Sequence, residues 1–146
     1  MHLKSLKNKV SKRWQVWIRQ GQIDLEAAKL SAKNGYYEWA TFQSQQCVEK
    51  LLKSIIVQAG FRPPKIHKIA ILMSFCNRVN EQFRNTKFDF REIESFTFIS
   101  RYPFLIPGEN SSPHDYITSE DADVCINQAE VLSKQVSTIL DYTLTI

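Results

Sequence analysis

A chain of 146 residues, 43% hydrophobic and 23% charged, has the size and composition of one globular domain, which excludes a disordered protein. Four glycines and five prolines are too few for a β-sandwich or barrel with many tight turns. Three widely spaced cysteines give no disulfide framework, and no run approaches the ~18 apolar residues of a membrane span. The basic N-terminus lacks the apolar stretch of a secretory signal, so we expect a cytoplasmic protein that does not bind membranes.

The formal net charge of +4 is unevenly distributed. Residues 1–13 carry five basic side chains and no acidic one, whereas residues 118–146 carry five acidic side chains and one basic. A basic N-terminal arm over residues 1–13 either binds phosphate backbones or is a solvated tail, and the sequence leaves both open. We expect a single helical domain over residues 14–146.

The spacing of apolar residues predicts helices along nearly the whole chain. The first has a narrow apolar face with members three and four residues apart: Trp14, Ile18, Gly21, Leu25, Ala28 and Ala32. Asn34 and Gly35 end this helix, because glycine suits the left-handed position after a helix. The second helix is expected over about 37–59. Gly60 ends it, and Pro63 and Pro64 exclude helix from the next loop.

Three more helices are expected in the second half of the chain. The third starts near His67, and its apolar face consists of Ile69, Leu72, Cys76, Val79 and Phe83. The fourth spans about 89–100, with Asp89 as its N-cap and Phe90, Ile93, Phe96 and Thr97 facing inward. Thr118 and Asp121 have the spacing of a capping box, which marks the start of the last helix. These elements predict an all-α fold, an up-and-down bundle of four to five antiparallel helices.

One connection is long. Residues 101–117 contain three prolines and show no helical period. Long ordered loops in small domains are usually functional, so this proline-rich loop before the last helix is the first place to look for a site. Its larger apolar side chains predict that it packs on the bundle: Tyr102, Phe104, Leu105, Ile106 and Tyr116.

A polar stripe and an arginine are the first candidate binding residues. Gln46, Glu49 and Lys53 lie at positions i, i+3 and i+7 of the second helix. Either they form a solvated face, or Gln46 and Glu49 anchor loop residues such as Arg101 in a partly buried network. A guanidinium at that place suits bidentate phosphate binding, and a salt bridge that fixes the loop is the structural alternative.

The histidines divide into one structural and one catalytic candidate. His67, at a helix start, is interpreted as a residue that caps or fixes that helix. His114 has Asp115 beside it in the long loop, and its imidazole suits a general base for attack by an RNA 2′-hydroxyl. Arg101 is the other candidate for catalysis.

The sequence predicts no metal and no cofactor. A di-iron bundle needs Glu-x-x-His pairs, but Pro64 and Ser111 stand three residues before the two candidate histidines. The cysteines fall on apolar helix faces, and the four isolated glycines form no phosphate-binding loop.

Four stretches, in order along the chain, resemble the HEPN domain (higher eukaryote and prokaryote nucleotide-binding). The matching residues are Asp24-Leu25 and Ala27-Ala28; Tyr37, Ala40, Phe42, Gln45-Gln46, Val48, Glu49-Lys50 and Leu52-Lys53; Gly60, Pro64 and His67; and Arg101-Tyr102-Pro103. The resemblance spans about Trp14 to Tyr142 and implies a helical bundle that is commonly a homodimer. It also implies pairing with a minimal nucleotidyltransferase in a toxin–antitoxin module.

Other HEPN branches are metal-independent RNases with an Arg-x(4–6)-His motif, and this sequence departs from that motif. Arg62 and His67 are the only formal match, but they flank the Pro63-Pro64 pair. Arg101 and His114 are separated by twelve residues, which is too many.

Three functions remain open at this stage. The first is a nucleotide- or RNA-phosphate-binding module, paired with a nucleotidyltransferase. The second is an RNase whose Arg/His site is composed across a homodimer, and the third is a helical scaffold without a ligand. The binding residues expected for the first are Arg101, Tyr102, Gln46, Glu49 and Lys53.

Overall fold

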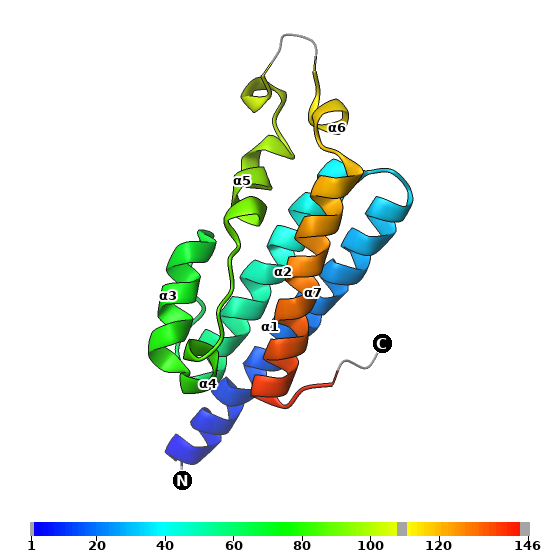
Figure 1. The fold of residues 1–146 in the computed structure, drawn as a ribbon. Coiled ribbons are helices and arrows are strands. Elements are labelled where there is room, and N and C mark those ends of the chain that lie inside the picture. Colours follow the sequence, from blue (N-terminus) through cyan, green and yellow to red (C-terminus); the bar gives the residue numbers. More distant parts are fainter. Residues whose placement is uncertain (1, 108–110, 144–146) are drawn as a thin grey trace.

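Three long helices form the centre of the structure (Figure 1): α1 (His2–Lys33), α2 (Tyr37–Gln58) and α7 (Ser119–Leu140). The computed structural model describes residues 2–107 and 111–143, with their side chains except those of residues 2–12 and 105. Two further helices, α3 (Ile69–Val79) and α5 (Arg91–Ile99), cover another side of α2. The short elements are α4 (Glu81–Arg84), the 3-10 turn η1 (Pro103–Leu105) and α6 (Pro113–Tyr116). The described residues contain no strand, which confirms the all-α prediction.

The predicted boundaries of the long helices are largely confirmed. Gly35 (φ 84°) and Gly60 (φ 101°) adopt the left-handed conformation after α1 and α2, where glycine has no Cβ to clash. The capping box at α7 is present, since Thr118 Oγ1 accepts the Asp121 N–H at 3.2 Å and an Asp121 oxygen accepts the Thr118 N–H at 2.9 Å. The backbone of the basic N-terminal segment is helical from His2.

Two helix ends differ from the prediction. The third helix stops at Val79, because the Asn80 side chain accepts the Phe83 N–H at 2.8 Å and starts α4 instead. Phe83 is buried nonetheless. The N-cap of α5 is Phe90 rather than Asp89, whose carboxylate accepts the Arg91 N–H at 3.1 Å from outside the helix.

The long loop is more ordered and less buried than predicted. It contains α6, which begins with its own capping box between Ser112 and Asp115. Ile106 is buried against the bundle, but Phe104 is 81% exposed and Tyr102 and Tyr116 are exposed too, so the packing prediction is wrong for these three rings. The side chain of Leu105 lies outside the described residues.

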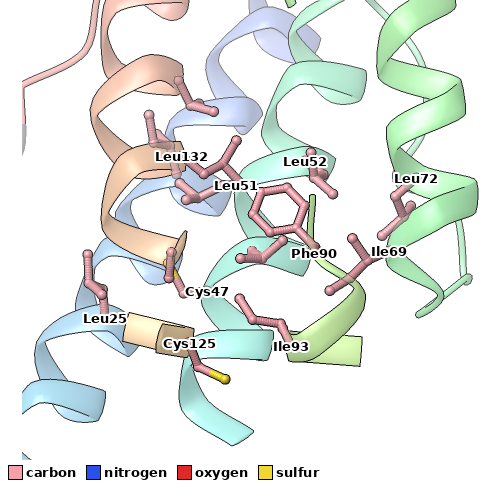
Figure 2. Packing of buried hydrophobic residues seen from close by; sticks show 14 of the residues in the cluster. Leu25, Cys47, Leu51, Leu52, Ile69, Leu72, Phe90, Ile93, Cys125 and Leu132 are labelled. Atoms are coloured by element: carbon pink, nitrogen blue, oxygen red, sulfur yellow. The ribbon is translucent and has the colours of Figure 1, made fainter. Parts of the chain in front are cut away.

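The core lies where α2 meets its neighbours (Figure 2). Leu51 and Leu52 of α2 are fully buried, and Leu132 of α7 and Ile93 of α5 reach the same cluster from two sides. Because α2 is surrounded by α1, α7, α3 and α5, its polar residues are buried as well as its apolar ones. Direct side-chain contacts to α2 therefore position the candidate site.

The three cysteines are free and buried. Burial raises the pKa of the Cys76 and Cys125 thiols to about 12, and it raises that of Cys47 as well. These thiols stay protonated and unreactive in the folded protein at neutral pH. Within the described part of the chain, no three His, Cys, Asp or Glu side chains gather as metal ligands. No helix there is long and apolar enough to cross a membrane.

Candidate functional site

One face of α2 organises the candidate site. Glu38, Phe42 and Glu49 are four and seven residues apart, so they fall on the same side of the helix. Each contacts a side chain from a distant segment: Glu38 holds His114, Phe42 lies against Arg101, and Glu49 holds His67.

Arg101 lies among aromatic rings. Its Nε donates to the Thr97 carbonyl at 3.0 Å, as a cation placed at a helix C-terminus does. The guanidinium carbon is 4.7 Å from the ring centre of Phe42, 5.2 Å from that of Tyr102 and 5.6 Å from that of Phe98. These cation–π contacts orient the group without neutralising its charge.

No carboxylate among the described residues pairs with Arg101, so the salt-bridge interpretation of this residue does not hold there. A guanidinium has five N–H donors, and the hydrogen bond to Thr97 uses only the one at Nε. The terminal amino groups therefore keep the planar fork that matches the oxygens of a phosphate.

The surface around Arg101 is aromatic and exposed. We define the aromatic face by its rings: Trp39, Phe42, Phe98, Tyr102 and Phe104. The ring centres of Trp39 and Phe42 are 6.1 Å apart in an edge contact, and those of Tyr102 and Phe104 are 5.7 Å apart. The guanidinium of Arg101 contacts both Phe42 and Tyr102 and so joins the two pairs. All except Phe42 are exposed. The aromatic face lies at the end of the bundle that holds the C-terminal end of α5 and helix α6 (Figure 1).

His114 lies one turn of α2 away from Arg101. Its Nδ1 is 2.9 and 3.1 Å from the two oxygens of Glu38, a buried carboxylate. Glu38 and Phe42 are separated by four residues, or about 6 Å along the helix axis. The structure thus places His114 and Arg101 over adjacent turns, although twelve residues separate them in sequence. The ring nitrogen Nε2 of His114 is not used by Glu38.

The hydrogen bonds of Asp115 go to Ser112 rather than to His114. Its carboxylate accepts the Ser112 hydroxyl at 2.8 Å and the Ser112 N–H at 3.3 Å, which closes the capping box of α6. These hydrogen bonds hold the pKa of the Asp115 carboxyl below its usual value. The carboxylate that binds His114 is Glu38.

The polar stripe of α2 does not anchor Arg101. Glu49 is 5% exposed and binds His67 Nδ1 at 2.7 Å, which fixes the segment before α3, as a structural His67 requires. Gln46 donates to Gln45 at 2.7 Å, and Lys53 is 5% exposed with its amine 5.7 Å from the Trp17 ring centre. The solvated-face prediction is wrong at Glu49 and Lys53, because the segment before α3 covers Glu49 and α1 covers Lys53. Glu49 binds His67 rather than Arg101.

A family model for the HEPN domain matches residues 14–139 of the chain. The chain belongs to the HEPN domain family. Among HEPN relatives, the protein named "Putative toxin MJ1304" of Methanocaldococcus jannaschii is 30% identical over 122 residues, which is 80% of each chain.

Two solved structures resemble the HEPN bundle. ST0689, described as an archaeal HEPN homologue, has a TM-score of 0.60 and 29% identity over 87% of this chain and 97% of its own. TT1696 from Thermus thermophilus has a TM-score of 0.70 over 86% of this chain and 97% of its own. At 21% identity, TT1696 supports the fold alone.

Sequence reasoning missed part of this HEPN site. The Arg-Tyr-Pro motif points to Arg101 and Tyr102, and Phe98 and Phe104 stand within three residues of Arg101, which was an available signal. Glu38 carried no signal, because its partner is 76 residues away.

Proposed function

We propose that this HEPN chain is a nucleotide- and RNA-phosphate-binding module that acts with a minimal nucleotidyltransferase in a toxin–antitoxin system. Arg101 carries the proposal, since an oriented guanidinium without a carboxylate partner in the described structure suits a phosphate. The relative named as a toxin supports the toxin role. Tyr102 extends the same site with an exposed ring.

We further propose that the module is a homodimer in the cytoplasm. The rings of the aromatic face adjoin one another and are mostly exposed, and contiguous exposed apolar surface is typical of protein interfaces. Light scattering at micromolar concentration is expected to give twice the chain mass of 17.0 kDa. A single 17.0 kDa species would contradict the dimer.

RNA cleavage is the second candidate function, and one observation favours it. His114 and Arg101 lie over adjacent turns of α2, so a phosphodiester bound at Arg101 would place a 2′-hydroxyl near an imidazole. In that reaction His114 removes the hydroxyl proton, the 2′-oxygen attacks phosphorus to form a 2′,3′-cyclic phosphate, and the 5′-oxygen leaves with a proton from solvent water. Because the module binds RNA in either function, activity distinguishes them.

The test compares Arg101→Lys with Arg84→Lys. Lysine keeps the charge but loses the planar fork, so we expect Arg101→Lys to weaken binding of nucleotides, short RNA or the nucleotidyltransferase by about 1–3 kcal/mol. Arg84 is the matched control, because its Nε also donates to a backbone carbonyl, that of Asn77, at 2.7 Å. Titration calorimetry measures each affinity, with unfolding curves recorded in parallel.

Three outcomes separate the functions. Equal affinity of wild type and Arg101→Lys for every ligand contradicts the binding module. Cleavage of short RNA that His114→Ala abolishes, while binding persists, establishes the RNase. Wild-type protein that binds no nucleotide, RNA or nucleotidyltransferase is the result expected of a scaffold.

A further inference from the structure

The segment between α2 and α3 is exposed and carries only positive charge. Residues 61–80 contain Arg62, Lys65, Lys68 and Arg78 and no acidic side chain. The first three lie in the non-helical residues 61–68, which we call the basic loop, and all three are exposed. Pro63 and Pro64 restrict the backbone there, so the charges are displayed on a stiff connection.

The charges of the basic loop are not neutralised. None of Arg62, Lys65 and Lys68 forms an ion pair with a described residue. By contrast, Lys50 of α2 binds Asp24 of α1, and Lys29 of α1 binds Glu130 of α7. The loop itself holds no acid, and the two carboxylates beside it are engaged, Glu49 by His67 and Glu94 by the Ile69 N–H at 2.8 Å. Exposed cations therefore dominate the surface that a polyanion meets.

Aromatic rings accompany these cations. Phe61 is 49% exposed and makes an edge contact with Phe75 at 5.4 Å, and the guanidinium of Arg78 lies 5.7 Å from the Phe75 ring centre. Cations beside exposed aromatic rings are typical of surfaces that bind single-stranded nucleic acid, where phosphates meet the charges and unpaired bases meet the rings.

The basic loop and Arg101 both contact α2, so one ligand can reach both of them. His67 fastens the loop to Glu49, and Phe42 holds Arg101. Glu49 and Phe42 are seven residues apart on α2, which is nearly two full turns and about 10 Å along the axis. They therefore share a face of the helix, so one strand that runs along α2 can reach both.

We propose that the basic loop is a second contact surface for the backbone of a single-stranded RNA whose other contact is Arg101. This inference rests on the proposed function, because it extends the same ligand from the aromatic face along α2. Phosphates bind Arg62, Lys65 and Lys68, and an unpaired base stacks on Phe61. A duplex hides its base faces and binds less well.

The test is the salt dependence of RNA binding. For a single strand, the slope of log affinity against log salt is about −0.7 for each phosphate neutralised. The triple variant Arg62→Gln, Lys65→Gln and Lys68→Gln is therefore expected to make the slope shallower by about 2. Fluorescence anisotropy with a short unstructured RNA, from low to physiological salt, measures it.

A matched control has the same loss of charge elsewhere. Lys33, Lys87 and Lys134 are exposed and form no ion pair with a described residue, so their triple change to Gln also lowers the net charge by three. The control is expected to leave the slope nearly unchanged. Thermal melting checks that both variants fold.

The outcomes separate this inference from the proposed function. If Arg101→Lys weakens RNA binding while the basic-loop variant behaves as the control, the second surface is wrong and the proposed function stands. If wild-type protein binds mononucleotides through Arg101 but no RNA, the second RNA surface is wrong and the nucleotide-binding function stands. If polyglutamate competes as well as RNA and the basic loop sets its salt slope too, an acidic protein replaces RNA as the partner.

Discussion

Glu49 is buried and its partner His67 is exposed, so removing the histidine should destabilise the protein more than removing the charge of the glutamate. In the pair of His67 and Glu49, the imidazole is 78% exposed and the carboxyl side chain 6% exposed. His67→Ala leaves a buried carboxylate without its imidazole partner, which costs about 1–3 kcal/mol. Glu49→Gln removes the charge, and the exposed imidazole turns to water at little cost.

The expected magnitude is about 2 kcal/mol for His67→Ala and below about 1 kcal/mol for Glu49→Gln. For a domain of this size the first corresponds to a fall of about 4–8 °C in melting temperature. Urea unfolding at pH 7 measures both changes. The double variant is expected to regain at least about 1 kcal/mol over His67→Ala, because position 49 then carries no buried charge without a partner.

The pair of His114 and Glu38 provides a repeat of the same experiment, since its side chains are 57% and 9% exposed. The reasoning is refuted if Glu49→Gln costs more than His67→Ala. It is also refuted if the double variant is no more stable than His67→Ala alone.

Three other predictions concern local structure. Thr118→Ala breaks the capping box of α7 and should cost about 1 kcal/mol in urea unfolding, whereas Thr138→Ala, exposed on the same helix, should cost less. Gly35→Ala should lower stability by about 1–2 kcal/mol in the same assay, because its φ of 84° strains any residue with a Cβ. The Arg91 guanidinium holds the pKa of Asp89 at about 2, so the stability from this pair is present above the ordinary value of 3.8 and is lost as pH falls toward 2. Arg91→Gln should return the NMR titration midpoint of Asp89 toward 3.8, and an unchanged midpoint would contradict the pairing.

The sequence was most informative where a signal is local. The ends of α1 and α2 depend on single glycines, and the capping box depends on two residues three apart, so both were predictable. The break at Asn80 was not, because Val79 and Phe83 continue the apolar period across it. Both α3 and α4 pack on the same core, so one hydrophobic pattern spans two helices.

The direction of α3 also lay beyond local signals. His67 lies beside Glu49 and Phe61 lies against Phe75, so α3 runs parallel to α2 rather than antiparallel. The connection after Gly60 returns along α2 before α3 begins. Apolar periodicity gives the face of a helix and carries no information about its direction.

The His–Glu pairs were unpredictable for a related reason. A buried glutamate in a helix looks like a solvated one in sequence, and its partner lies 18 residues away in one pair and 76 in the other. Only the three-dimensional arrangement shows which carboxylates of α2 are covered.

The three-residue connection between α1 and α2 has a consequence for how the chain folds. The two helices form an antiparallel hairpin closed by Asn34, Gly35 and Tyr36, whereas α7 joins them only after about 60 further residues have been placed. Short loops close with little loss of chain entropy, so the hairpin is the natural nucleus and α7 docks late. Core substitutions facing only α1 and α2 should then slow refolding, and those in α7 should mainly speed unfolding.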